Sequence, residues 1–240
     1  MTMVVKINQQ LRIGGLTPLT TIDYPHHLSC VIYCQGCSWR CRYCHNPDML
    51  VTNRESTHQW YEILEFLERR KGLLEAVIFS GGEPLTQKYL LTSIQQVKKL
   101  GFKIGLHTAG SLPNRLEQLL PSIDWVGFDV KDLPKNTDAI TQVKGSGKNN
   151  WQSLKILVES DVDFQCRTTV HWQLIKPQRL IKLTQKLANL SIDDYVIQFS
   201  RTETMLDPTL GYSVLPPKYI KQLKDNLIEI MPSIEFSPNI

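Results

Sequence analysis

Four of the six cysteines in the chain lie within the stretch Cys34-Gln35-Gly36-Cys37-Ser38-Trp39-Arg40-Cys41-Arg42-Tyr43-Cys44-His45-Asn46-Pro47. A short apolar run leads into this stretch and ends at Cys34. Three of these cysteines, Cys37, Cys41 and Cys44, have the spacing C-x3-C-x2-C, so their thiolates can converge on one metal centre from a single loop. Soft thiolates select zinc or iron–sulfur clusters. A cubane cluster with three protein thiolates leaves one iron open, much as a catalytic zinc keeps one open position. The stretch therefore predicts a metal centre.

The composition is that of an ordinary globular protein, with 42% hydrophobic and 21% charged residues among 240. The formal net charge is +4, and no Lys/Arg cluster is dense enough to indicate nucleic acid binding. This charge is typical of a solvated surface or of a groove for an acidic cofactor or protein partner. The start of the chain shows no signal-peptide pattern, and no run of about 18 apolar residues occurs. We therefore expect a cytoplasmic protein without a membrane span, in which clustered cysteines bind metal rather than form disulfides.

Six short apolar runs alternate with segments of helical periodicity. The predicted strands are 28–34, 75–80, 102–107, 123–130, 163–170 and 195–199. The predicted helices are 57–71, with Thr57 as N-cap, 87–100, 113–120, 149–160, 177–190 and 216–230. This alternation predicts an α/β fold with a parallel sheet covered by helices. Six units are too few for a full TIM barrel, which leaves a partial barrel or a doubly wound sheet.

The remaining segments are expected to belong to a single domain spanning 1–240. Residues 1–27 form an N-terminal lead-in, in which Gly14-Gly15 and Pro18 predict turns. Residues 132–147 are predicted to be a long polar loop, and 201–240 a C-terminal extension with a helix.

Several unusual residues follow predicted strands, at the sheet edge where parallel α/β folds bind ligands. In Gly81-Gly82-Glu83-Pro84, the glycines let the backbone approach a ligand and the carboxylate can receive a cationic amine; a tight turn is the alternative. Asp129 and Lys131 are two apart on a strand, so they point the same way and form either a functional pair or a rim ion pair. Arg167, in an apolar strand, either holds a carboxylate or faces solvent.

The other cysteines and the histidines are less informative. Cys30, Cys34 and Cys166 are most simply small buried hydrophobes, with Cys34 also a candidate fourth ligand. His45 follows Cys44 and either supports the metal site or stabilises a turn. The remaining histidines lack a two-histidine ligand spacing and are expected to be structural or on the surface: His26, His27, His58, His107 and His171. The sequence has no nucleophile elbow, Walker-type loop or Rossmann fingerprint.

The cysteine spacing, the aromatic Tyr43 and the downstream Gly-Gly-Glu-Pro together resemble the radical S-adenosylmethionine (SAM) enzymes. More narrowly, the chain resembles the glycyl-radical-enzyme activases, above all the activating protein of anaerobic (class III) ribonucleoside-triphosphate reductase. This likeness covers most of residues 12–200. The segments that carry it are Thr21–Pro25, Gln35–Cys37, Cys44–Pro47, Ser80–Pro84 and Asp129–Lys131.

The resemblance implies a partial (β/α)6 barrel of the radical SAM type with one [4Fe–4S] cluster. Three irons would be bound by Cys37, Cys41 and Cys44, and the fourth by the amino and carboxylate groups of SAM. The implied SAM-binding residues are Tyr43 at the adenine, Gly81, Gly82 and Glu83 at the methionine amino group, Asp129 and Lys131, Arg167 at the carboxylate, and more weakly Thr108. Pyruvate formate-lyase activase has a histidine near SAM after strand six, where this chain has Gln198.

The implied reaction is reductive cleavage of SAM to a 5′-deoxyadenosyl radical, which takes hydrogen from a glycine of the partner enzyme. No side chain is implied as a catalytic acid or base. The chain lacks the extra cysteine motifs of some activases, so an external reductant such as flavodoxin or ferredoxin is expected. One alternative is a radical SAM enzyme acting on a small molecule, like 7-carboxy-7-deazaguanine synthase. Another is a structural zinc module with four thiolates, Cys34, Cys37, Cys41 and Cys44.

Overall fold

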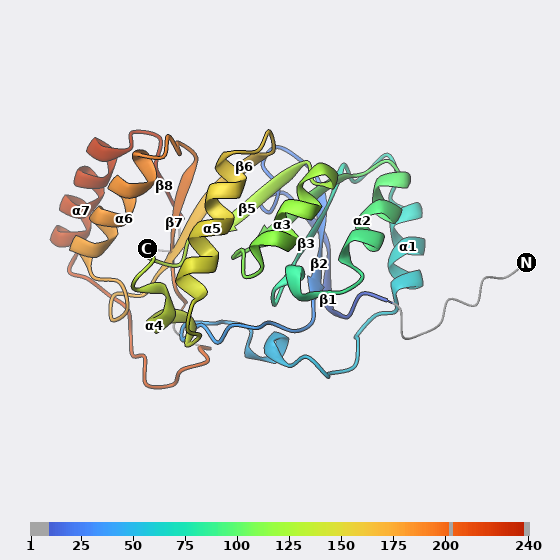
Figure 1. Cartoon of the computed structure of the whole chain (residues 1–240), viewed down its shortest axis with the longest axis horizontal. Coiled ribbons are helices and arrows are strands. Elements are labelled where there is room, and N and C mark those ends of the chain that lie inside the picture. Colours follow the sequence, from blue (N-terminus) through green and yellow to red (C-terminus); the bar gives the residue numbers. More distant parts are fainter. Residues whose placement is uncertain (1–9, 202–203, 238–240) are drawn as a thin grey trace, which may run out of the picture.

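The computed structural model describes residues 10–201 and 204–237, which contain one eight-stranded sheet (Figure 1). Its strands are β1 (Ile13–Thr20), β2 (Ser29–Cys34), β3 (Ala76–Gly81), β4 (Lys103–Thr108), β5 (Trp125–Asp129), β6 (Asp163–Val170), β7 (Tyr195–Phe199) and β8 (Glu235–Phe236). The α-helices are α1 (Trp60–Glu68), α2 (Leu90–Lys99), α3 (Pro113–Leu119), α4 (Thr137–Thr141), α5 (Ser146–Val158), α6 (Pro177–Ala188) and α7 (Pro217–Ile230). Within these ranges, no helix combines the length and apolar character needed to cross a membrane.

The strands follow one another in sequence order across the sheet, from β1 to β8. Strands β2 to β8 pair in parallel, and only β1 is antiparallel to its neighbour. A doubly wound sheet would reverse its strand order, so the structure excludes that option and confirms the open, partial barrel. Because parallel crossovers are right-handed, the connecting helices cover one face. Figure 1 shows them as a row from α1 on the right to α7 on the left.

Side chains alternate between the two faces of the curved sheet. On β3, Phe79 packs with Trp60 of α1 in the main core under the helices, at 6.4 Å between ring centroids. Ile78, which precedes Phe79 on β3, points to the opposite face of the sheet and belongs to a second apolar cluster with Tyr24 and Trp125. Tyr24 stacks on Trp125 at 5.1 Å and comes from the loop between β1 and β2. This loop therefore fills part of the barrel interior.

The lead-in differs from the prediction, because Gly14-Gly15 and Pro18 lie within strand β1 rather than in turns. Proline is tolerated there since β1 is an edge strand with a register shift between Thr17 and Thr20. At Gly14 a Cβ would lie against the ends of the Met49 and Gln35 side chains, which would have to shift. Residues 1–9 of the lead-in lie outside the described residues.

Three further boundaries were predicted wrongly. The segment 132–147 is not all loop, since it contains α4 and the start of α5. Asp138 organises this segment by accepting hydrogen bonds from the N–H groups of Gly145 and Gly147. Helix α1 begins at Trp60 with a Gln59 capping box, later than the expected Thr57 cap. The C-terminal extension contains α7 as expected and also β8, which was missed; 202–203 and 238–240 fall outside the described residues.

Candidate active site

The cysteine loop leaves the end of β2 and is held by hydrogen bonds to its own far end and to α4. The Gln35 amide nitrogen donates to the carbonyls of Asp48 and Val51, both at 2.8 Å, which ties the start of the loop to its end. The N–H groups of Arg40 and Arg42 donate to the carbonyls of Thr141 and Ile140 in α4, both at 2.9 Å. The two ends of the loop are therefore tied to each other, and its middle is tied to α4, by hydrogen bonds that need no metal.

Leu206 and Asp207 of the C-terminal extension form a further set of contacts with the loop, which we call the clasp. The N–H of Leu206 donates to the Cys44 carbonyl at 3.0 Å, and that of Asp207 donates to the Arg42 carbonyl at 2.9 Å. The Arg42 guanidinium also pairs with the Asp207 carboxylate at 2.6 Å. A segment more than 160 positions away thus holds the middle of the cysteine loop.

A cavity of about 280 Å³ opens at the carboxyl ends of the strands. All of the residues predicted for the metal and cofactor site line it: Cys37, Cys41, Tyr43, Cys44, Gly81, Gly82, Glu83, Thr108, Asp129, Lys131, Arg167 and Gln198. These residues come from the cysteine loop and from β3 to β7. The structure therefore brings the whole predicted set to one place.

The three thiols of the motif are free and half-buried. Burial raises the pKa of Cys37 to about 12 and that of Cys41 to about 11, so metal binding must displace their protons. Among the described residues, no group of three or more His, Cys, Asp or Glu side chains is arranged to hold a single metal ion. A cluster places each thiolate on a different iron, so the sulfurs need not meet at one point.

The other cysteines lie elsewhere. Cys30 and Cys34 on β2 and Cys166 on β6 are all fully buried in the main core. Burial raises the pKa of each thiol well above its ordinary value. The prediction of small buried hydrophobes is confirmed for these three, and Cys34 does not join the other thiols at the cavity. His45 lines the cavity beside Cys44.

The Gly-Gly-Glu turn packs directly against the cysteine loop. Gly81 has a φ of +101°, which favours glycine, and Gly82 leaves no room for a Cβ because the Gly36 carbonyl lies against it. The Gly82 N–H donates to the Cys34 carbonyl and the Glu83 N–H to the Gly36 carbonyl, both at 2.9 Å. The two motifs therefore form one unit.

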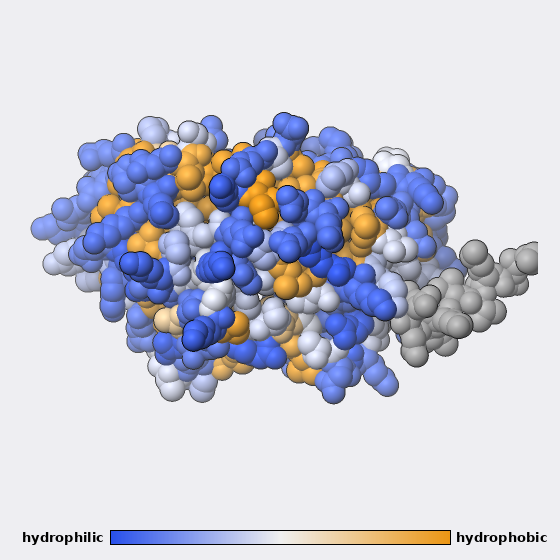
Figure 2. Space-filling view, viewed as in Figure 1, coloured by the Kyte–Doolittle hydropathy of each residue, from blue (hydrophilic) through white to orange (hydrophobic). Residues whose placement is uncertain are grey.

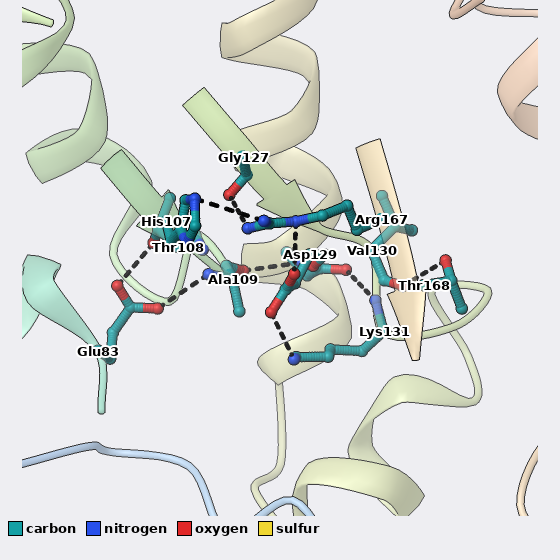
Figure 3. Close-up of polar contacts among 12 residues, drawn as sticks. Glu83, His107, Thr108, Ala109, Gly127, Asp129, Val130, Lys131, Arg167 and Thr168 are labelled. Atoms are coloured by element: carbon teal, nitrogen blue, oxygen red, sulfur yellow. Dashed lines mark hydrogen bonds and ion pairs between the residues drawn. The ribbon is translucent and has the colours of Figure 1, made fainter. Parts of the chain in front are cut away.

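The Glu83 carboxylate is buried and accepts three hydrogen bonds from its own chain. Figure 3 shows the two from Thr108 and Ala109. The donors are the Thr108 hydroxyl at 2.6 Å and the N–H groups of Leu85 and Ala109, both at 3.1 Å. Burial raises the pKa of this carboxyl, and the three donors oppose that rise. Glu83 thus joins the end of β3 to the end of β4.

Asp129, Lys131 and Arg167 form a charged network on the opposite wall (Figure 3). The Lys131 ammonium donates to Asp129 at 3.0 Å, and the Arg167 Nε lies 3.5 Å from the other carboxylate oxygen. Burial alone would raise the pKa of Asp129, but the two cations hold it below its ordinary value. The lysine and arginine side chains are only 10% and 12% exposed, so Asp129 is their main compensating charge.

His107 was expected to be structural or on the surface, and the structure places it in the cavity wall. Its Nε2 lies 2.8 Å from the Asp23 carbonyl, and burial followed by the nearby Arg167 lowers its pKa to about 3, so the ring is neutral. Sequence analysis missed Gly127. A Cβ there would lie 2.5 Å from the Arg167 guanidinium and 2.8 Å from the His107 ring. Because side chains alternate along a strand, Gly127 could have been placed on the same face as Asp129 from the sequence. To place His107 on that face, one must also know that it pairs with Gly127 on the neighbouring strand.

The family model of the radical SAM superfamily matches residues 31–172, which include the cysteine loop and strands β3 to β6. The chain belongs to the radical SAM superfamily. Membership implies a [4Fe–4S] cluster and SAM as cofactors. The cavity fits them, because it presents three free thiols of the required spacing beside a buried network of charged side chains.

Among curated relatives of this radical SAM chain, a Methanocaldococcus jannaschii protein named as a glycyl-radical enzyme activating enzyme is 29% identical over 65% of the chain and 67% of its own length. The pyruvate formate-lyase-activating enzyme of Clostridium pasteurianum is 31% identical over 62% of the chain and 63% of its own length. The 7-carboxy-7-deazaguanine synthase of Thermococcus kodakarensis is 27% identical over 52% and 56%, respectively. The chain thus spans between about half and two thirds of these relatives' lengths.

Solved structures show the same fold. The Streptococcus suis protein SuiB, solved with S-adenosylmethionine bound, superposes with a TM-score of 0.64 at 17% identity. The superposition covers 86% of this chain and 49% of SuiB. The partial barrel is therefore that of radical SAM enzymes.

Proposed function

We propose that this chain activates a glycyl radical enzyme, and that its partner is the anaerobic (class III) ribonucleoside-triphosphate reductase. The observation that carries the proposal is the single cavity that joins three free thiols to the Asp129–Lys131–Arg167 network. Two relatives named as activating enzymes support the activase assignment. The choice of partner is supported by the motif resemblance.

In this proposal Cys37, Cys41 and Cys44 hold one [4Fe–4S] cluster. When bound, the cluster and SAM supply one-electron reductive chemistry. The protein contributes a loop that is fixed in advance by Gln35, by α4 and by the Leu206–Asp207 clasp. Such pre-organisation positions the cofactors and limits access of water to them.

The cavity walls divide the binding of SAM between two kinds of contact. The amino group of SAM is assigned to the Gly81–Glu83 turn, where the Glu83 carboxylate accepts hydrogen bonds from Leu85, Thr108 and Ala109 and keeps acceptor capacity for a cationic donor. The SAM carboxylate is assigned to Arg167, whose planar fork suits it. The remaining assigned contacts are Tyr43 to the adenine, and Thr108, Asp129, Lys131 and Gln198 around the cavity.

The test is anaerobic reconstitution with iron and sulfide, reduction with dithionite, and chromatography for 5′-deoxyadenosine formed from SAM. We expect product from the wild type and from Cys166→Ala, a matched core cysteine, but not from Cys41→Ala. Addition of purified class III reductase should then give a glycyl radical signal by electron paramagnetic resonance. Cleavage of SAM without that signal would count against this partner.

A second candidate is favoured by the Thermococcus kodakarensis relative, whose name is 7-carboxy-7-deazaguanine synthase. A small-molecule enzyme of this kind would share the cluster and SAM contacts. It differs in its substrate, so turnover of a deazaguanine precursor in the same assay, without any effect on a glycyl radical enzyme, would favour this candidate.

A further inference from the structure

The inner face of helix α5 changes character along its length. Figure 2 shows the side of the molecule that the helices cover as mostly hydrophilic, as expected for a surface in contact with solvent. On the buried side of α5, however, the first half carries Ser146, Asn150 and Ser153, and apolar residues, Leu154 and Leu157, follow only toward its end. Buried polar side chains are costly unless they form hydrogen bonds. The polar half of this face therefore needs partners on the sheet.

Asn150 is completely buried and uses both ends of its side-chain amide to hold two strand ends. Its Nδ2 donates to the carbonyl of Ala109 at 2.8 Å and to that of Asp129 at 2.9 Å. Its Oδ1 accepts from the N–H of Lys131 at 3.3 Å. Ala109 directly follows β4, and Asp129 is the last residue of β5. One side chain thus bridges the ends of two neighbouring strands.

Each of these strand ends carries one wall of the cavity. The N–H of Ala109 donates to the Glu83 carboxylate at 3.1 Å, so a hold on the Ala109 carbonyl steadies the peptide segment that orients Glu83. On the other wall, the bonds from Asn150 fix the backbone on both sides of the valine between Asp129 and Lys131. The directions of those two charged side chains therefore depend on the same amide.

Two neighbouring side chains make related bonds but reach less far. The Thr168 hydroxyl donates to the Val130 carbonyl at 2.8 Å, which supports the charged wall from β6 (Figure 3). Asn149 precedes Asn150 on α5 and donates to the carbonyl of Ser111 at 3.0 Å. Ser111 does not line the cavity. Thr168 therefore supports one wall and Asn149 neither, whereas Asn150 supports both.

We propose that Asn150 is a positioning residue, which holds the Glu83 wall and the Asp129–Lys131 wall at a fixed separation and thereby sets the affinity for SAM. It acts through these residues, since it is fully buried and does not itself line the cavity. A binding site loses affinity when the groups that line it are not held in place by residues behind them. The proposal rests on the proposed binding of SAM but not on the identity of the activated enzyme.

The test compares Asn150→Asp with Asn149→Asp, a control with the same charge change at the preceding position of α5. Asn150→Asp turns the donor that faces two carbonyls into an acceptor, whereas the control loses only the bond to Ser111. Because a new buried charge can unfold a variant, Asn150→Ser is measured beside it, which removes the amide without adding charge. Thr168→Val removes the bond to Val130 alone.

Two quantities are measured on each variant. Hydrogen exchange at the amides of Ala109 and Lys131 is followed by NMR on the cofactor-free chain, and the affinity for SAM is measured by calorimetry on the reconstituted protein. Denaturant unfolding identifies conditions in which every variant is fully folded. Under those conditions, a change that only lowered stability would leave the SAM affinity at the wild-type value.

We expect both Asn150 variants to exchange about 10-fold faster than the wild type at both amides, because both strand ends lose a bond. Thr168→Val should accelerate exchange at Lys131 only, and Asn149→Asp at neither amide. Both Asn150 variants should bind SAM about 10-fold more weakly than Asn149→Asp does.

Exchange that accelerates at Lys131 but not at Ala109 in both Asn150 variants would overturn the proposal, because Asn150 would then support one wall. A SAM affinity equal to that of Asn149→Asp would overturn it as well. Absence of SAM binding in the wild type would contradict the proposed function and, with it, the effect on affinity. Hydrogen exchange of the cofactor-free chain would still confirm or refute the link between the two walls.

Discussion

Glu83 and Asp129 are two carboxylates of one cavity with opposite electrostatic surroundings. Glu83 is almost completely buried and accepts only from neutral donors, so burial dominates and raises its pKa. Asp129 lies between Lys131 and Arg167, which overcome the effect of burial and lower its pKa. The same residue chemistry thus serves two purposes, since Glu83 joins two strand ends whereas Asp129 holds two cations in place.

Asp129→Asn should have the largest effect, because it removes the carboxylate that holds the two cations. Removal of this charge leaves Lys131 and Arg167 buried without compensation, and we expect a loss of about 2–3 kcal/mol in the free energy of unfolding. The estimate is modest for a buried pair because the Asp129 side chain remains 32% exposed to the cavity. Denaturant unfolding of the chain without cofactors measures it.

Glu68→Gln is the matched control, because it breaks the exposed Glu68–Lys71 pair at 2.7 Å. That change should cost less than about 1 kcal/mol. Equal losses in the two variants would show that the cavity network is no stronger than a surface pair.

Gly127→Ala should disturb the Asp129–Lys131–Arg167 network and leave the contacts of Glu83 unchanged. The new methyl group would press on the Arg167 guanidinium and the His107 ring, so we expect a loss of about 1–3 kcal/mol together with weaker SAM binding. Gly15→Ala is the control, since a Cβ there meets its nearest atom at an ordinary 3.5 Å. Unchanged SAM affinity in Gly127→Ala, measured by calorimetry on the reconstituted protein, would contradict a positioning role for Gly127.

The smallest expected effect concerns pH and Glu83→Gln. Because the folded pKa of Glu83 is raised, its contribution to stability is complete below the ordinary carboxyl pKa and is lost as the pH rises through the raised value. We expect the variant to be about 1 kcal/mol less stable than wild type near pH 5, and the gap to narrow toward pH 8. For Asp129→Asn the gap should instead narrow as the pH falls, because that pKa is lowered. If the stability difference between wild type and Glu83→Gln instead widened as the pH rose, the pKa of Glu83 would be lowered, like that of Asp129.

Local sequence features predicted the strands and the site well because each rests on neighbouring residues. The apolar runs gave β2 to β7 within a few residues, and the cysteine spacing and the Gly81–Glu83 turn predicted two walls of the cavity. The errors came from contacts between distant segments. His107 enters the site only through the pairing of β4 with β5, and β1 is a strand only because β2 lies beside it. The pairing of these strands cannot be predicted from the residues within each strand alone.

The clasp of Leu206 and Asp207 on the cysteine loop has a consequence for the order of synthesis. The segment that binds Arg42 and Cys44 is synthesised well after the loop, since Asp207 lies 165 positions beyond Arg42. Until then the loop lacks two backbone bonds and its partner for Arg42. The cysteine loop therefore cannot take its final form until the Leu206–Asp207 segment has been synthesised, so we expect a cluster to be held stably only after that point.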